Sequence, residues 1–178
     1  WFIDDTFTID KQWVIDFTKR LRDENINLRW GCQARVNTVD LEMLSEMKKA
    51  GCVQVDFGVE SGSPQVLKIL KKGANPEMVR DAFGLCKKVG LRSLATFMVG
   101  NPGETYADIE MTKKLVDDIK PDFSTFFFTT PYPGTELFDM ANSNQWLRNS
   151  DYQNWSVRNT PVLEINFKPQ ELIKIRAK

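Results

Sequence analysis

The sequence contains no histidine, which removes the side chain most often used as a general base and as a zinc ligand. Cysteine is scarce, and the three thiols of Cys32, Cys52 and Cys86 are odd in number and widely spaced. That pattern excludes a disulfide framework and indicates a reducing, intracellular setting. No apolar run approaches the roughly 20 residues of a membrane-spanning helix, and no signal peptide is visible. We therefore expect a cytoplasmic protein without a membrane partner.

An excess of either charge is also missing, because 24 lysines and arginines balance 24 aspartates and glutamates. A neutral chain lacks the basic surface that nucleic acid requires, so no nucleic-acid partner is expected. Hydrophobic residues make up 42% of the 178 residues and charged residues 27%, as in one ordinary globular domain. The chain starts at Trp1 and stops within a helical pattern that begins at Pro169, which suggests an excerpt from a longer protein.

Short apolar runs alternate with helical patterns along most of the chain. The end of a strand is expected at residues 1–3, and further strands at 27–32, 52–59, 91–99 and 122–130. Helices begin after Asp10, Thr38 or Asp40, Ser63, Asn75, Thr105 and Thr135. Five units in about 145 residues match the roughly 30 residues of a βαβ unit. The pattern predicts an α/β fold with a parallel sheet, either doubly wound or part of a (β/α) barrel. Residues 1–145 would form it, and residues 146–178 would be a tail packing on it or leaving it.

Polar or glycine-rich residues end each expected strand, where parallel α/β folds bind their ligands. The candidates for binding are Asp4, Asp5, Gln33, Arg35, Glu60, Ser61, Val99, Gly100 and Asn101. Simpler roles stand beside these: the aspartates as turn and cap residues, Arg35 as a surface ion-pair partner, and the cysteines as small buried hydrophobes. Glu60 is the hardest of these residues to explain by such a simple role, because a carboxylate that ends an apolar strand needs a partner or a ligand.

Five strand-end strings resemble a known family, in the right order and spacing. Residues 2–7, 32–36, 57–63, 98–105 and 131–137 resemble the second to sixth strands of radical S-adenosylmethionine (radical SAM) enzymes, in the subgroup often preceded by a cobalamin-binding domain. The resemblance implies a partial (β/α)6 barrel that lacks the first strand and its CxxxCxxC loop. In this family that loop binds a 4Fe-4S cluster, and SAM is reductively cleaved to methionine and a 5′-deoxyadenosyl radical.

The resemblance also implies roles for the strand-end residues toward SAM. Asp4 or Asp5 would accept from the ammonium group, and Gln33 or Arg35 would hold the carboxylate. Glu60 and Ser61 would bind the ribose hydroxyls. Adenine would lie against the polypeptide at Val99, Gly100 and the turn that begins at Asn101.

The chain departs from the family in one respect: no CxxxCxxC motif is present, and the three cysteines lie too far apart in sequence to replace it. We therefore expect no metal ligands in this chain and no activity of the chain alone. The cluster would come from an upstream part of the same protein and electrons from a flavodoxin- or ferredoxin-type donor, with cobalamin as a further cofactor in that subgroup and an unidentified small-molecule substrate. The alternatives are a non-radical (β/α) barrel lyase or isomerase using Glu60 as a base, and a non-catalytic binding module.

Overall fold

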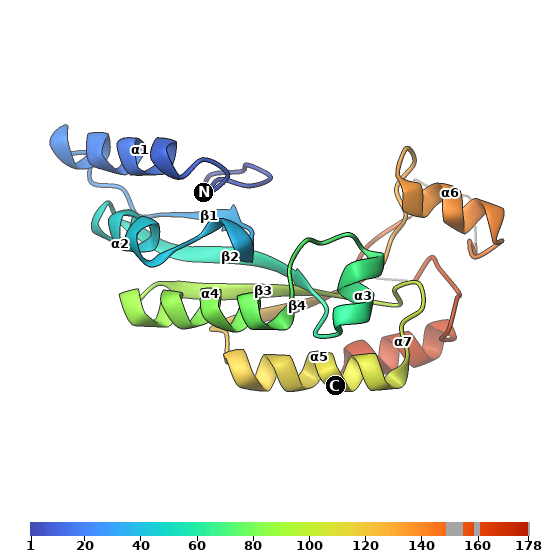
Figure 1. The fold of residues 1–178 in the computed structure, drawn as a ribbon. Helices are drawn as coiled ribbons and strands as arrows, with labels where there is room; N and C mark the ends of the chain where they lie inside the picture. Colours follow the sequence, from blue (N-terminus) through green and yellow to red (C-terminus); the bar gives the residue numbers. More distant parts are fainter. Residues whose placement is uncertain (149–154, 159–160, 178) are drawn as a thin grey trace.

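A computed structural model describes residues 1–148, 155–158 and 161–177 of the chain (Figure 1). The strands are β1 (Trp30–Ala34), β2 (Cys52–Glu60), β3 (Arg92–Val99) and β4 (Phe123–Phe128). The helices are α1 (Lys11–Asp23), α2 (Leu41–Lys49), α3 (Pro64–Ile69), α4 (Pro76–Val89), α5 (Tyr106–Ile119), α6 (Glu136–Ser143) and α7 (Pro169–Arg176), with a short 3-10 turn at Val36–Thr38.

The four strands form one parallel sheet in the order β1-β2-β3-β4. A doubly wound sheet reverses its strand order at a switch point, so this sequential order excludes that alternative. Helices α1, α2, α4 and α5 contact one another in that succession and form a single layer along the sheet (Figure 1). Crossovers of one hand place successive helices on one face, which is the arrangement of a barrel wall. The fold is α/β, and it is the partial (β/α) barrel that the sequence predicts.

The strand end expected at residues 1–3 is only a single bridge in the structure. Residues 1–3 do not form a strand, and only Phe2 pairs, through a single parallel bridge to Cys32. The chain then turns at residues 5–8, and Ile3 is 87% exposed. A single bridge makes too few ladder hydrogen bonds to form a strand. The other expected strands are present, although β1 begins at Trp30 instead of Asn27 because residues 27–29, the apolar Leu28 included, form an exposed loop.

The helix boundaries follow the capping signals in the sequence. Asp10 and Asp40 each cap a helix by accepting a hydrogen bond from the backbone three residues later, and Asp40, not Thr38, starts α2. Thr105 and Asp108 form the expected capping box at the start of α5. Gly90 ends α4 with a φ of +73°, a conformation that favours glycine. Local side-chain chemistry therefore fixes where the chain enters and leaves the helical layer.

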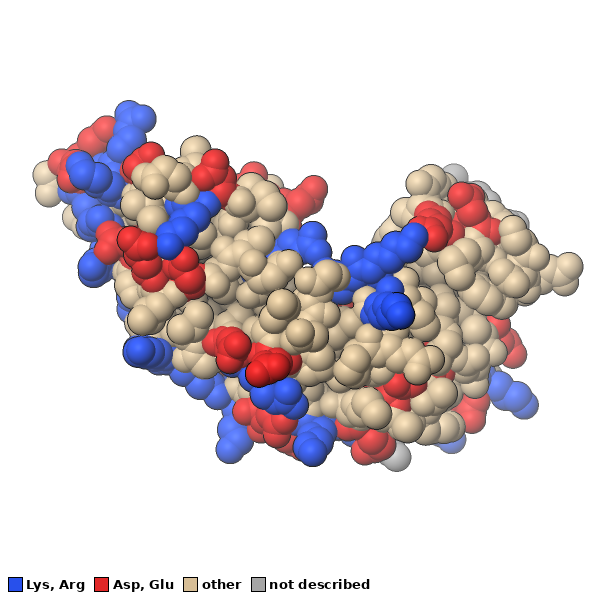
Figure 2. Space-filling model, in the orientation of Figure 1, with Lys and Arg blue, Asp and Glu red and all other residues tan. Residues whose placement is uncertain are grey.

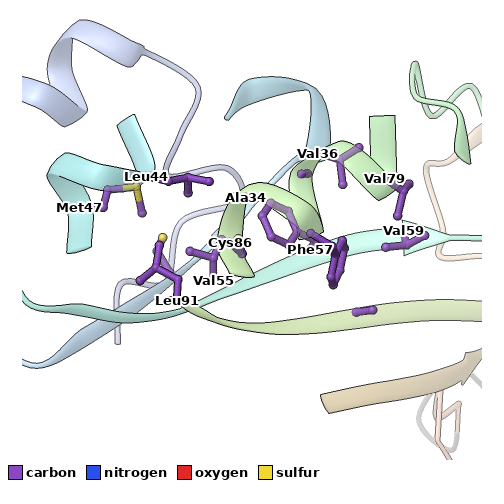
Figure 3. Packing of buried hydrophobic residues seen from close by; sticks show 14 of the residues in the cluster. Ala34, Val36, Leu44, Met47, Val55, Phe57, Val59, Val79, Cys86 and Leu91 are labelled. Carbon is purple, nitrogen blue, oxygen red and sulfur yellow. The ribbon is translucent and has the colours of Figure 1, made fainter. Parts of the chain in front are cut away.

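The main core lies between the sheet and this helical layer. Figure 3 shows Val55 and Phe57 of β2 beneath Cys86 of α4 and Leu44 and Met47 of α2. All three cysteines are free and buried in this cluster, which confirms them as small core residues. Burial raises the pKa of Cys86 to about 12, so its thiol stays protonated at neutral pH.

A smaller cluster joins the tail to the end of the sheet. Phe167 and Leu172, the latter on α7, pack with Val99, Ile109 and Phe128. α7 therefore covers the outer side of β3 and β4 beside α5 (Figure 1). Among the described residues, no helix has the length and apolar character needed to cross a membrane.

Candidate functional site

A cavity of about 700 Å³ lies on the inner face of the sheet, opposite the helices. Successive side chains of a strand point to opposite faces, so each strand contributes alternate residues to this cavity. From β2 these are Asp56, Gly58 and Glu60, and from β3 they are Leu94 and Thr96. The cavity is thus lined by polar side chains where the interior of a closed barrel is usually filled by branched apolar ones.

Four of the residues singled out in the sequence meet at this cavity: Asp5, Gln33, Arg35 and Glu60. They come from the turn after the first bridge and from the ends of β1 and β2. Asp4 is exposed and does not line the cavity, so Asp5 is the member of the pair that is turned toward it.

Glu60 ends β2 in a left-handed conformation with a φ of +71°, which is uncommon for any residue other than glycine. Its carboxylate forms an ion pair with Lys72, with 2.8 Å between Oε1 and Nζ. The carbonyl of Lys72 accepts a hydrogen bond of 2.6 Å from Arg35 Nη2. A methyl group on Gly58 would lie 2.7 Å from Glu60 Oε1 and 2.9 Å from Lys72 Nζ, so glycine leaves room for the pair. Arg35, Lys72 and Glu60 therefore form one polar wall.

Ser61 points away from this wall and is fully buried. Its hydroxyl lies 3.2 Å from Thr112 Oγ1 on α5, and Thr112 Oγ1 also accepts from the backbone N–H of Gly62 at 2.9 Å. A methyl group on Gly62 would lie 2.5 Å from the carbonyl oxygen of Met111, so only glycine allows this approach to α5. The Ser61–Ser63 turn therefore anchors the end of β2 to α5.

Asp108 extends this anchor to the next loop. Its carboxylate accepts hydrogen bonds from the hydroxyl of Ser63 and from the backbone and hydroxyl of Thr105. Burial alone would raise its pKa, but the hydrogen bonds from Ser63 and Thr105 outweigh burial and lower it below its usual value. One carboxylate thus holds the loops after β2 and β3 together.

The loop after β3 is organised around a residue that the sequence reasoning passed over. Glu104 is fully buried, and its carboxylate accepts from the backbone N–H of Gly100 at 2.7 Å and from that of Asn101 at 3.2 Å. The side-chain amide of Asn101 donates to Glu104 and to the carbonyl of Met98, and its oxygen accepts from Thr129. Burial raises the pKa of Glu104 above its ordinary value. Asn101 and Gly100 are therefore engaged inside the loop.

A second cavity, of about 430 Å³, continues from the first between α3 and α6 and shares Glu60 and Lys72 with it. Met98 and Tyr132 line it, whereas Val99, Gly100 and Asn101 line neither cavity. Val99 instead packs on the helical side of the sheet. Figure 2 shows the molecule hollowed between the part that carries α6 and the rest, with lysine or arginine side chains at the edge of the hollow.

Lys72 and Asp56 are further site residues that the sequence reasoning missed. Asp56 was readable from the alternation of β2, since it lies four residues before Glu60 and so faces the same way. Lys72 had no such signal, because it lies in the loop after α3 and reaches the site only through tertiary packing.

The resemblance implies two cofactors, SAM and a 4Fe-4S cluster, and each needs its own set of donor groups. Among the described residues, no group of three or more cysteines, aspartates or glutamates could hold a metal ion, so this chain does not fit a 4Fe-4S cluster. Asp5 and Arg35 both line the cavity, so it offers one acidic and one basic side chain to a ligand that carries an ammonium and a carboxylate.

Comparison with known proteins gives the family. Residues 2–116 match the radical SAM superfamily. An uncharacterized methyltransferase from Pyrococcus horikoshii is 35% identical over 178 residues, which span 99% of this chain and 39% of the relative. Anaerobic magnesium-protoporphyrin IX monomethyl ester cyclase from Rubrivivax gelatinosus is 31% identical over 76% of this chain and 25% of that protein. The chain therefore spans well under half the length of these relatives.

Solved structures agree on the fold. The radical S-adenosylmethionine methyltransferase TsrM from Kitasatospora setae, with cobalamin and a 4Fe-4S cluster bound, superposes with a TM-score of 0.70 at 20% identity over 84% of this chain and 29% of that one. The cobalamin-dependent radical enzyme OxsB gives a TM-score of 0.62 at 19% identity over 80% of this chain and 22% of that one. Taken with the match over residues 2–116, the strand-end motifs and the partial barrel, these comparisons mean that the chain belongs to the radical SAM superfamily.

Proposed function

We propose that the two joined cavities bind S-adenosylmethionine, and that the chain is the cofactor-binding wall of a radical SAM enzyme. The observation that carries this proposal is the convergence of Asp5, Gln33, Arg35 and Glu60 on one cavity at the strand ends of a radical SAM barrel. Residues from three separate segments of the chain meet there, which chance placement of surface charge does not explain.

In this proposal Arg35 holds the carboxylate of SAM and Asp5 accepts from its ammonium group. Glu60 accepts from the ribose hydroxyls, because its carboxylate lies where the two cavities join. Ser61 acts indirectly, by anchoring the turn that orients Glu60.

The adenine ring is assigned to the second cavity, against Met98 and Tyr132. A planar apolar ring suits such walls. The loop from Gly100 to Glu104 borders this cavity through Pro102, and hydrogen bonds of Glu104 and Asn101 fix its shape. This differs in detail from the sequence-based expectation, which assigned the adenine contact to Val99, Gly100 and Asn101.

The chemistry is proposed for the intact protein, in which a 4Fe-4S cluster supplied by CxxxCxxC cysteines would reduce SAM to methionine and a 5′-deoxyadenosyl radical. Methyl transfer is the reaction class we favour, because the relative that aligns over 99% of this chain is named a methyltransferase. Cobalamin as a second cofactor is supported by the cobalamin-containing structures that share the fold. Electrons would come from a flavodoxin- or ferredoxin-type donor.

The test uses the intact protein, purified without oxygen. Iron and sulfide are determined, dithionite and SAM are added, and the products are separated by chromatography. The proposal predicts about four irons per protein, as a 4Fe-4S cluster requires, and the formation of 5′-deoxyadenosine. A protein without iron that leaves SAM intact would contradict the proposal and favour the non-radical lyase or isomerase, with Glu60 as its base.

A further inference from the structure

The inner face of β2 continues below the proposed SAM site as a column of polar residues. Starting from Glu60, the inward positions are Gly58 and Asp56, followed by Gln54. At about 3.3 Å per residue, Asp56 lies roughly 13 Å along the strand from Glu60, so it forms the floor of the cavity. Gly58 has no side chain to close the passage between them.

Among the residues that the structure describes, no lysine or arginine forms an ion pair with Asp56. Its only hydrogen bond within the part of the chain that the structure describes comes from the side-chain amide of Gln54, at 2.9 Å. Burial raises the pKa of this partly buried carboxyl above its ordinary value. A desolvated carboxylate with one neutral donor is costly, and an opposite charge would offset that cost.

The cations that line the cavity are all engaged elsewhere. Lys72 pairs with Glu60, and Lys71 pairs with Glu136. Arg35 donates to the carbonyl of Lys72, and Arg158 lies over the ring of Phe127, 5.4 Å from its centroid. None of them forms an ion pair with Asp56 among the described residues, so the floor carries a negative charge that the protein itself does not balance.

The surroundings of Asp56 suit a nitrogen cation. The side chains of Thr96 and Thr125 flank the same cavity on β3 and β4, and hydroxyl oxygens accept hydrogen bonds from ammonium groups. Thr96 pairs with Gly58, so the two hydroxyls lie two residues beyond Asp56 toward Glu60. Asp56 and these hydroxyls together offer acceptors to one positively charged group with several N–H donors.

We propose that Asp56 and its neighbours on the cavity floor bind a primary ammonium group or a comparable nitrogen cation of the substrate, beneath SAM. This inference rests on the proposed function, because it places the substrate in the same cavity as the cofactor. The substrate class is therefore an amine or another molecule with a protonated nitrogen at the end that enters first.

The test uses the intact protein and three small probes of matched size: butylammonium, n-butanol and butyrate. Binding of each is measured by isothermal titration calorimetry to the wild type, to Asp56→Asn and to Asp81→Asn, which changes an exposed aspartate on α4 as a matched control. The wild type and the control are expected to bind butylammonium at least tenfold more tightly than butanol, and butyrate least. Asp56→Asn is expected to lose at least tenfold in butylammonium affinity and none in butanol affinity.

SAM is the second arm of the test, and it separates this proposal from the proposed function. SAM affinity is expected to stay within twofold in Asp56→Asn, and SAM is expected not to displace butylammonium. Displacement, or a loss of SAM binding in Asp56→Asn, would assign Asp56 to the cofactor and overturn the inference. Equal affinity of the wild type for butylammonium and butyrate would overturn it without recourse to any variant. Failure of SAM to bind the wild type would instead contradict the proposed function.

Discussion

Lys72 Nζ lies 2.8 Å from Glu60 Oε1, and each of the two side chains is only 19% exposed. Removing one member of such a pair leaves the other as a poorly solvated charge. We predict that Lys72→Met lowers the free energy of unfolding by about 2 kcal/mol, less than the loss for a fully buried pair because water still reaches this one. Urea denaturation measures this change.

The double variant Glu60→Gln/Lys72→Met is the control for that prediction. It removes both charges, so its loss of stability should be smaller than the sum of the two single losses, with a coupling of about 1 kcal/mol. Additive losses would mean that the two side chains do not stabilise each other.

We predict that the hydroxyl group of Thr112 is what holds the turn after Glu60 to α5. Thr112→Val keeps the shape of the side chain but leaves the buried N–H of Gly62 without an acceptor, which should cost about 2 kcal/mol of stability. Thr112→Ser keeps the hydroxyl and should lose less than half as much. Thermal denaturation of both variants measures these losses, and a larger loss in Thr112→Ser than in Thr112→Val would show that the methyl group, not the hydroxyl, holds the turn.

Gly62→Ala tests the same contact between the turn after Glu60 and α5, and Gly84→Ala is its control. A methyl group at Gly62 would meet backbone atoms of α5, at 2.5 Å from the Met111 oxygen and 2.6 Å from the Thr112 Cα, which cannot easily move. Gly62→Ala should therefore destabilise the protein by about 2 kcal/mol or more, as overpacking does. Gly84→Ala meets nothing within 4 Å on α4 and should stabilise it by roughly 0.5–1 kcal/mol. A tolerated Gly62→Ala would contradict the close approach of the turn to α5.

The free energy of unfolding is predicted to depend on pH through the buried carboxyl group of Glu104. Burial raises its pKa in the folded protein above the ordinary value of 4.5, so the folded state binds its proton more tightly than the unfolded state does. The stability that this preference gives is present below the unfolded pKa and is lost as pH rises through the folded one. Urea denaturation of the wild type and Glu104→Gln between pH 4 and pH 7 should show the wild type losing stability relative to the variant. A constant difference would contradict the raised pKa.

The sequence predicts most of the fold because its signals are local. The capping box of Thr105 and Asp108 and the left-handed Gly90 depend only on neighbouring residues. Alternating strand–helix patterns predict a parallel sheet, but the pattern alone left its architecture open, and the sequential strand order resolves that in favour of a barrel wall. The expected strand at residues 1–3 fails because a strand depends on its partners, which a local pattern does not contain.

The candidate site was predictable where strand geometry decides it. Gln33, Arg35 and Glu60 lie at strand ends and face the cavity, and the same alternation turns Ser61 and Val99 to the helical side. Lys72 was not predictable, since a loop residue reaches the cavity only through the packing of α3. The parts of the tail at residues 149–154, 159–160 and 178 lie outside the described residues.

The central claim is that this cavity binds SAM through Glu60 and Arg35, and the most direct measurement is SAM affinity in the intact, cluster-loaded protein. Glu60→Gln and Arg35→Met are compared with Glu110→Gln, which changes an exposed glutamate on α5. A lost hydrogen bond to a charged group costs about 1.5–3 kcal/mol, so each site variant should bind SAM at least tenfold more weakly while the control stays unchanged. Unchanged affinity in both site variants, with the protein still folded, would contradict the account.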